Sequence, residues 1–283
     1  MKPKSITAFA HAQTRSRLKR VLTQVRRAAT HPQDPEVIHD LRVSIRRFTQ
    51  CLRTFRSLFN PRPVKKLKRS LRNLMDLCAA VRSCDVALAV LQQAGVPPGA
   101  STSKLGAARG QAEQALRDHL KKERRRKNPD WEKRLQLDVQ KGSEWDPDQS
   151  LPENVRGVLS KQAKDFFEAG TAAAVAGADY QTLHQFRLLA KRFRYTLELF
   201  PSYYGRDMGR GLQALKDLQD RLGMINDCIA TIALIRKDDR AVAAVRKLLR
   251  QREEEFQSFW QSEFPAEKLA WWQGWLRRPV TVT

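Results

Sequence analysis

Two short stretches of the chain combine a histidine with regularly spaced cations. The first runs from His39 to Phe48 and reads HDLRVSIRRF, and the second runs from His184 to Phe193 and reads HQFRLLAKRF. In both, a cation follows the histidine at the third, seventh and eighth positions. Arginine and lysine donate hydrogen bonds to oxyanions, and histidine can do so from one ring nitrogen. The spacing therefore predicts two related anion-binding segments.

Each stretch also has the period of an amphipathic helix. At ~100° per residue, the apolar side chains fall on one face and the cations on a neighbouring stripe. Because the pattern recurs 145 residues later, it predicts two similar helical halves. We expect the buried faces to be formed by Leu41, Ile45, Phe48, Leu52, Phe55 and Phe59 in the first copy and by Phe186, Ala190, Phe193, Leu197 and Phe200 in the second.

A charged stripe beside an apolar stripe is usually no more than a solvated helix face. Here no acidic residue is spaced to neutralise Arg42, Arg46 or Arg53, and like charges at helical spacing repel one another. The second copy has Glu198 four residues after Arg194, so only its last turn is compensated. Uncompensated cations in both halves favour an anion site over a solvated face.

The candidate site residues combine the two motif helices with a basic segment that follows the first. A tight turn after the first helix would bring the basic faces of two consecutive helices together. In the second half, Lys216 matches Arg72 of that segment. The candidate anion-binding residues are His39, Arg42, Arg46, Arg47, Lys65, Lys68, Arg69, Arg72, His184, Arg187, Lys191, Arg192, Arg194 and Lys216.

The net charge of +23 is unevenly distributed along the chain. Residues 1–141 contain 32 Lys and Arg against 11 Asp and Glu, whereas residues 142–283 contain 21 against 19. This asymmetry predicts a polyanionic partner that is bound mainly by the first half. Inorganic polyphosphate, nucleic acid and an anionic membrane all fit the charge alone.

Helical periodicity dominates the whole chain, and no segment alternates like a strand. The fold class is therefore expected to be all-α, with a helical half at 1–141 and another at 142–283. We expect helices at residues 5–30, 36–60, 64–80, 84–94, 104–127, 153–176, 180–200, 206–221, 226–236, 239–260 and 265–276.

Cysteine usage and hydropathy indicate the compartment. The four cysteines have neither disulfide-rich nor metal-site spacing, and Cys84 and Cys228 occupy near-equivalent places as small packing residues. No apolar run approaches the ~20 residues of a membrane span, and no signal peptide is evident. We therefore expect a cytoplasmic protein with no membrane partner, no cofactor and no metal. The sequence leaves its oligomeric state open.

The two motifs and the segments after them resemble the family of the CHAD domain, the conserved histidine α-helical domain. Arg82-Ser83-Cys84-Asp85 and Leu222-Gly223-Met224-Ile225-Asn226-Asp227 are similar to two further elements of that family. Ser83 stands where the family usually has Asp, and Thr49 where an arginine often follows the paired arginines. The likeness covers nearly the whole chain. It implies a single CHAD domain at 1–283 made of two four-helix-bundle-like halves, binding of inorganic polyphosphate, and no established catalytic reaction.

Our leading interpretation is non-catalytic binding of inorganic polyphosphate in a basic groove or channel lined by Arg, Lys and His of both halves. Such a chain has no bases, so recognition rests on charge and on hydrogen bonds to its oxygens. The histidines either contact this ligand or fix the helix ends by hydrogen bonds.

Two other function classes remain open. An enzyme that processes phosphate chains would need a metal and gathered carboxylates, for which Asp40, Asp76, Asp85 and Asp227 are candidates. Non-specific nucleic-acid binding would use the basic charge, including the run at 121–127, but the chain has no helix-turn-helix, RRM or zinc-finger signature.

Overall fold

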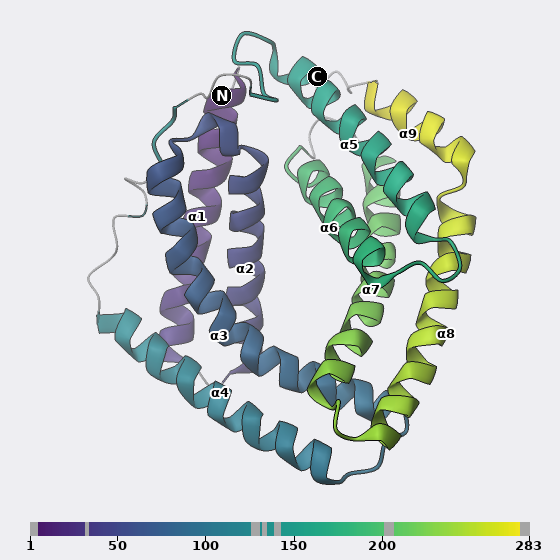
Figure 1. Ribbon diagram of the computed structural model, residues 1–283. Helices are drawn as coiled ribbons and strands as arrows, with labels where there is room; N and C mark the ends of the chain where they lie inside the picture. Colours follow the sequence, from purple (N-terminus) through teal and green to yellow (C-terminus); the bar gives the residue numbers. More distant parts are fainter. Residues whose placement is uncertain are drawn as a thin grey trace. The chain divides into compact units, whose positions relative to one another are not determined.

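The protein is seen in a computed structural model, which describes residues 5–31, 34–125, 131, 135–138, 143–200 and 207–277. Within these residues the regular structure is helical apart from one isolated bridge between Phe59 and Leu137, which confirms the all-α class (Figure 1). The chain divides into two compact units. Unit 1 comprises Met1–Asp85 and Lys104–Asn154, and unit 2 comprises Val86–Ser103 and Val155–Thr283.

Most helices begin and end within a few residues of the positions predicted from periodicity. A 3₁₀ turn, Arg56–Leu58, follows the second helix. The α-helices are α1 (Ile6–Thr30), α2 (Pro35–Thr54), α3 (Pro61–Gln93), α4 (Ala100–Arg125), α5 (Leu151–Ala173), α6 (Tyr180–Leu197), α7 (Asp207–Leu234), α8 (Asp239–Glu263) and α9 (Ala266–Arg277).

The predicted breaks near residues 81–83 and 222–225 are wrong, because α3 and α7 each run through without interruption. In α3 the segment contains neither glycine nor proline, and the Ser83 hydroxyl donates to the Ala79 carbonyl one turn earlier at 2.8 Å. In α7 the segment contains Gly223, which lies in open space. A lone glycine weakens a helix without ending it.

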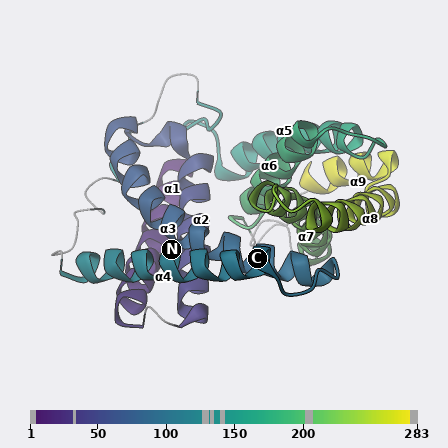
Figure 2. The same ribbon diagram turned by 60° about the horizontal axis from the view of Figure 1, so that its bottom comes forward.

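Unit 1 is built around α1, α2 and the first part of α3, which run side by side (Figures 1 and 2). The apolar residues predicted for the first motif helix are buried, with at most 1% of any of their side chains exposed, but Phe55 and Phe59 lie beyond the end of α2. The segment that follows α4 packs against the C-terminal end of α2. Trp145 is fully buried, its indole N–H donates to the Thr54 carbonyl at 2.7 Å, and its ring lies 5.2 Å from that of Phe55.

Unit 2 packs around a cluster of aromatic rings. The Phe166 ring of α5 lies 5.3 to 5.5 Å from those of Phe186, Phe193 and Trp260, which come from α6 and α8. The packing is close enough that a Cβ on Gly170 would lie 2.0 Å from the Trp260 ring. The predicted apolar face of α6 is therefore confirmed as core.

All four cysteines are buried thiols, as expected for packing residues. Burial raises the pKa of Cys78 and that of Cys228 to about 11. Both thiols therefore stay neutral at physiological pH.

Candidate functional site

Helix α2 positions the first group of predicted site residues. Asp34 caps its N-terminus by accepting hydrogen bonds from two backbone N–H groups of the first turn, at 2.9 and 3.3 Å. The apolar face turns inward, so the neighbouring stripe of cations stays at the surface. His39, Arg46 and Arg47 are exposed, whereas Arg42 is half-buried.

Within the part of the chain that the structure describes, the cations of α2 have no carboxylate partner. Within the described residues, Arg42, Arg46 and Arg53 form no ion pair. The Nη1 atom of Arg42 is buried and finds no hydrogen-bond acceptor in the same part of the chain. Burial lowers the pKa of this guanidinium, the nearby Cys78 opposes that effect, and the positive charges of Arg46 and Arg82 lower it further. Arginine nevertheless remains protonated, so α2 carries uncompensated positive charge.

The start of α3 continues this positive surface. Lys68 is half-buried, and burial, followed by the charges of Arg53 and Arg56, lowers the pKa of its ammonium group. Arg53 belongs to α2 and Arg56 to the 3₁₀ turn after it, so like charges from consecutive elements meet here. The other predicted cations of this segment are exposed: Lys65, Arg69 and Arg72.

A pocket of about 450 Å³ lies within unit 1, lined by side chains of α2, α3 and α4. It brings together two predicted site residues, His39 and Arg42, with two arginines that sequence reasoning missed, Arg82 and Arg109. Arg82 belongs to the segment Arg82-Ser83-Cys84-Asp85, and the resemblance of that segment to a family element could have identified Arg82 from the sequence. Arg109 had none beyond its helical spacing from Glu113.

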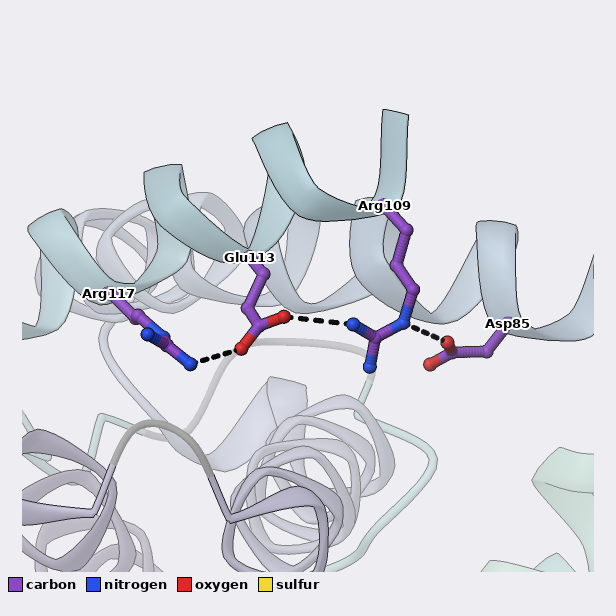
Figure 3. Close-up of polar contacts among 4 residues, drawn as sticks. All are labelled: Asp85, Arg109, Glu113 and Arg117. Carbon is purple, nitrogen blue, oxygen red and sulfur yellow. Dashed lines mark hydrogen bonds and ion pairs between the residues drawn. The ribbon is translucent and has the colours of Figure 1, made fainter. Parts of the chain in front are cut away.

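Four side chains of α3 and α4 form a row of alternating charges (Figure 3), and three of them, Asp85, Arg109 and Glu113, line the pocket. Arg109 donates from Nε to the Asp85 carboxylate at 2.6 Å and from Nη1 to Glu113 at 2.9 Å. Arg117 binds the other oxygen of Glu113. The hydrogen bond to Asp85 is the main reason why the pKa of Arg109 is raised. Each of the two carboxylates is therefore compensated by arginine.

Helix α6 presents the second copy of the motif. Asp179 caps it by accepting from the Thr182 N–H at 2.7 Å, which corresponds to the role of Asp34. His184 is half-buried beside the ring of Tyr180, and its Nδ1 is buried without a hydrogen-bond partner among the described residues. Aspartates therefore cap the two motif helices, and the histidines stand one turn further in.

The last turn of α6 is neutralised and fixed in place. Arg194 forms an ion pair with Glu198, as its spacing predicted, and its Nε donates to the Gln219 side chain of α7 at 2.8 Å. Gln219 in turn donates to the Ala190 carbonyl at 2.9 Å. The other predicted cations of α6 are half-buried, and each interacts with another group of the chain: Arg187, Lys191 and Arg192.

Two remaining features bear on the alternatives. Lys216 of α7 is exposed. The basic run at 121–127 is described only in part: Lys121 and Lys122 are exposed, and the side chains of residues 123–127 lie outside the described residues.

The carboxylates considered for catalysis are in part bound to arginines. Asp85 pairs with Arg109, and Asp40 lies 3.3 Å from Arg27. In the part of the chain that the structure describes, no three His, Cys, Asp or Glu side chains are grouped so that they could hold a metal ion. No helix there is long and apolar enough to span a bilayer.

Known proteins share this architecture. A family model described as the CHAD domain matches residues 12–236. The crystal structure of the CHAD domain from the plant Ricinus communis is 22% identical, with a TM-score of 0.57, over 98% of this chain and 94% of that one. PptA from Streptomyces chartreusis is 18% identical, with a TM-score of 0.58, over 92% of this chain and 100% of that one. At these identities both structures show the fold alone. A comparison with curated proteins finds no match.

Proposed function

Because this chain belongs to the CHAD-domain family, we propose that it binds inorganic polyphosphate without catalysing a reaction on it. The family is linked to polyphosphate binding in general. The observation that carries the proposal is the uncompensated positive charge of α2, where Arg42, Arg46 and Arg53 form no ion pair within the described residues. A helix selected only for its own stability would have glutamates three or four residues away from these arginines.

The chemistry of the ligand matches these side chains. Polyphosphate offers a row of anionic groups with nonbridging oxygens and no bases. The arginine fork donates two parallel hydrogen bonds to such oxygens, and lysine contributes a compact positive charge. The exposed cations of α2 and of the start of α3 are free to make these contacts: Arg46, Arg47, Lys65, Arg69 and Arg72.

Under this proposal, the second half of the chain contributes less to the binding affinity than the first half. Its motif helix carries His184, Arg187, Lys191, Arg192 and Arg194, and Lys216 follows on α7. Since Arg194 is already bound by Glu198 and Gln219, we assign most of the affinity to the first half. The protein would then act in the cytoplasm, in association with polyphosphate granules.

A titration with long-chain polyphosphate at several salt concentrations tests the proposal. If six or more phosphates are neutralised, affinity should fall on the order of a thousandfold between 50 and 200 mM salt, by analogy with DNA. A salt-independent affinity would sink the electrostatic explanation.

Competition with RNA separates polyphosphate from nucleic acid as the partner. Polyphosphate should displace RNA at a far lower phosphate concentration than RNA needs to displace polyphosphate. The reverse order would favour a nucleic-acid-binding protein. Release of orthophosphate from the chain during the titration would contradict the non-catalytic part of the proposal.

A further inference from the structure

The pocket of unit 1 has unused hydrogen-bond donors from three helices. Arg42 of α2 has its buried Nη1 without an acceptor among the described residues. Arg82 of α3 is exposed and forms no ion pair there. Arg109 of α4 uses Nε and Nη1 on carboxylates, while its Nη2 points away from both and has no acceptor in the same residues (Figure 3). A buried donor left unpaired is costly, so the pocket is suited to a ligand that supplies acceptors.

The carboxylates that line the pocket do not occupy these remaining hydrogen-bond donors. Asp85 and Glu113 are held by Arg109, and Glu113 also by Arg117, so that row is neutral as a whole. Glu36 is the remaining carboxylate of the lining. It is exposed in the first turn of α2 and unpaired within the described residues. The lining thus holds three arginines and three carboxylates, and Arg117, which pairs with Glu113 from the next turn of α4, leaves a surplus of one positive charge beside His39.

The volume and the lining of the pocket limit what can enter. Its volume of about 450 Å³ is in the lower part of the range for ligand sites. The side chains of Cys78, Val81 and Leu116 line it and are buried and uncharged. An internal phosphate group needs an exit on both sides for the rest of its chain. A terminal group needs only one opening, and it offers three terminal oxygens to donors arriving from three helices.

We propose that this pocket binds a phosphate group with at least three nonbridging oxygens, either the end of a polyphosphate chain or free orthophosphate. The inference rests on the proposed function and adds Arg82 and Arg109 to its binding residues. Arg42 and Arg82 bind the terminal oxygens, and Arg109 donates from Nη2 while its two carboxylates hold the guanidinium in place. The pocket would thereby distinguish chain ends from the chain interior.

Ligands that differ in their ends test this inference by calorimetry. Tripolyphosphate has two ends, cyclic trimetaphosphate has none, and orthophosphate is a free group of the same kind. The variant Arg82→Gln should weaken tripolyphosphate binding about tenfold, because it removes a charged hydrogen bond, and leave trimetaphosphate binding unchanged. Arg20→Gln, at an exposed arginine of α1 outside the pocket lining, is the matched control and should change neither.

A second variant has the opposite expected sign. Glu36→Gln should strengthen tripolyphosphate binding roughly twofold to threefold, because it removes an exposed like charge from the pocket. Orthophosphate that binds wild type and loses affinity in Arg82→Gln identifies the free group as a ligand. Tripolyphosphate binding without orthophosphate binding identifies the chain end.

Two results would overturn the inference: equal losses of tripolyphosphate and trimetaphosphate in Arg82→Gln, or no loss of tripolyphosphate. Long-chain polyphosphate, measured with the same proteins, keeps this failure apart from failure of the proposed function. If wild type binds the long chain while Arg82→Gln loses tripolyphosphate and trimetaphosphate equally, or loses neither, only the end-group inference fails. If wild type does not bind the long chain, the proposed function fails.

Discussion

Helices α2 and α6 carry the same motif but differ in how their charges are compensated. In α6 the last turn holds the ion pair Arg194–Glu198, and Gln219 binds the same arginine from α7. The equivalent positions of α2, 145 residues earlier, are Thr49 and Arg53. The first copy therefore has an extra uncompensated cation where the second has a neutral pair. His39 is exposed in a pocket, whereas His184 is half-buried beside Tyr180.

The difference shows that two copies of one helical motif can differ in how far their charges are compensated. The apolar positions are retained in both copies because each half needs a core. Among the described motif residues, Arg42, Arg46 and Arg53 of α2 form no ion pair, whereas Arg194 of α6 pairs with Glu198. The following predictions test whether this divergence sets the binding strength, beginning with the largest expected effect.

Removing two cations from α2 should have the largest effect. We expect Arg42→Gln with Arg46→Gln to weaken long-chain polyphosphate binding on the order of a hundredfold at low salt, as two charge-assisted contacts are lost. Glutamine keeps part of the side chain that packs at the half-buried Arg42, so the melting temperature should change little. Fluorescence anisotropy and thermal melts by circular dichroism measure both. The control is Lys19→Gln with Arg20→Gln on α1, which makes an equal change of charge at exposed positions. Unfolding of the α2 variant would show that the stripe of cations is structural.

Transferring the ion pair of α6 into α2 should weaken binding by a smaller factor. The variant Thr49→Arg with Arg53→Glu lowers the net charge by one and compensates the new arginine. We expect roughly tenfold weaker binding and a salt dependence reduced by about one phosphate contact. Glu198→Gln makes the opposite change in α6 and should strengthen binding a little. Unchanged affinity in both variants would mean that the last turns of these helices do not contact the ligand.

Removing the corresponding cations of α6 should cost less than removing those of α2. Arg187→Gln with Lys191→Gln is the equivalent of the first variant, and we expect a loss of about fivefold to tenfold in the same titration. The loss is smaller because these side chains already interact within the chain. A loss as large as that of the α2 variant would contradict the asymmetry between the halves.

The histidines should have the smallest effect, seen as a pH dependence. Histidine changes its charge between pH 5 and 8, and a bound anion favours the protonated form. Binding should therefore take up protons and strengthen roughly threefold as the pH falls from 8 to 6. Long-chain polyphosphate is the suitable ligand because its own titrating ends are few.

The two histidines should differ in this test. We expect His39→Asn to flatten the pH profile more than His184→Asn, since His39 is exposed among the arginines of the pocket. If His184→Asn instead lowers the melting temperature and His39→Asn leaves the profile unchanged, the histidines are structural.

Local patterns predicted the helices well, but not where long helices continue. Apolar periodicity placed both ends of α1, α6 and α8 within three residues of where the structure has them. The breaks predicted in α3 and α7 fall at a segment that contains Ser83 and at one that contains Gly223. A short polar segment or one glycine costs a helix too little to end it when both flanks are packed.

The sequence by itself determined the all-α class, the buried faces of α2 and α6, the two stripes of cations and the Arg194–Glu198 pair. Each of these depends on residues within a few turns of one another, so helical periodicity is sufficient to find them. Only the tertiary structure decided that Arg109 bridges Asp85 and Glu113, that Gln219 binds Arg194, and that Arg82 joins His39 in one pocket. These contacts join separate helices, and the packing of the apolar faces, which no single segment encodes, sets which polar side chains meet.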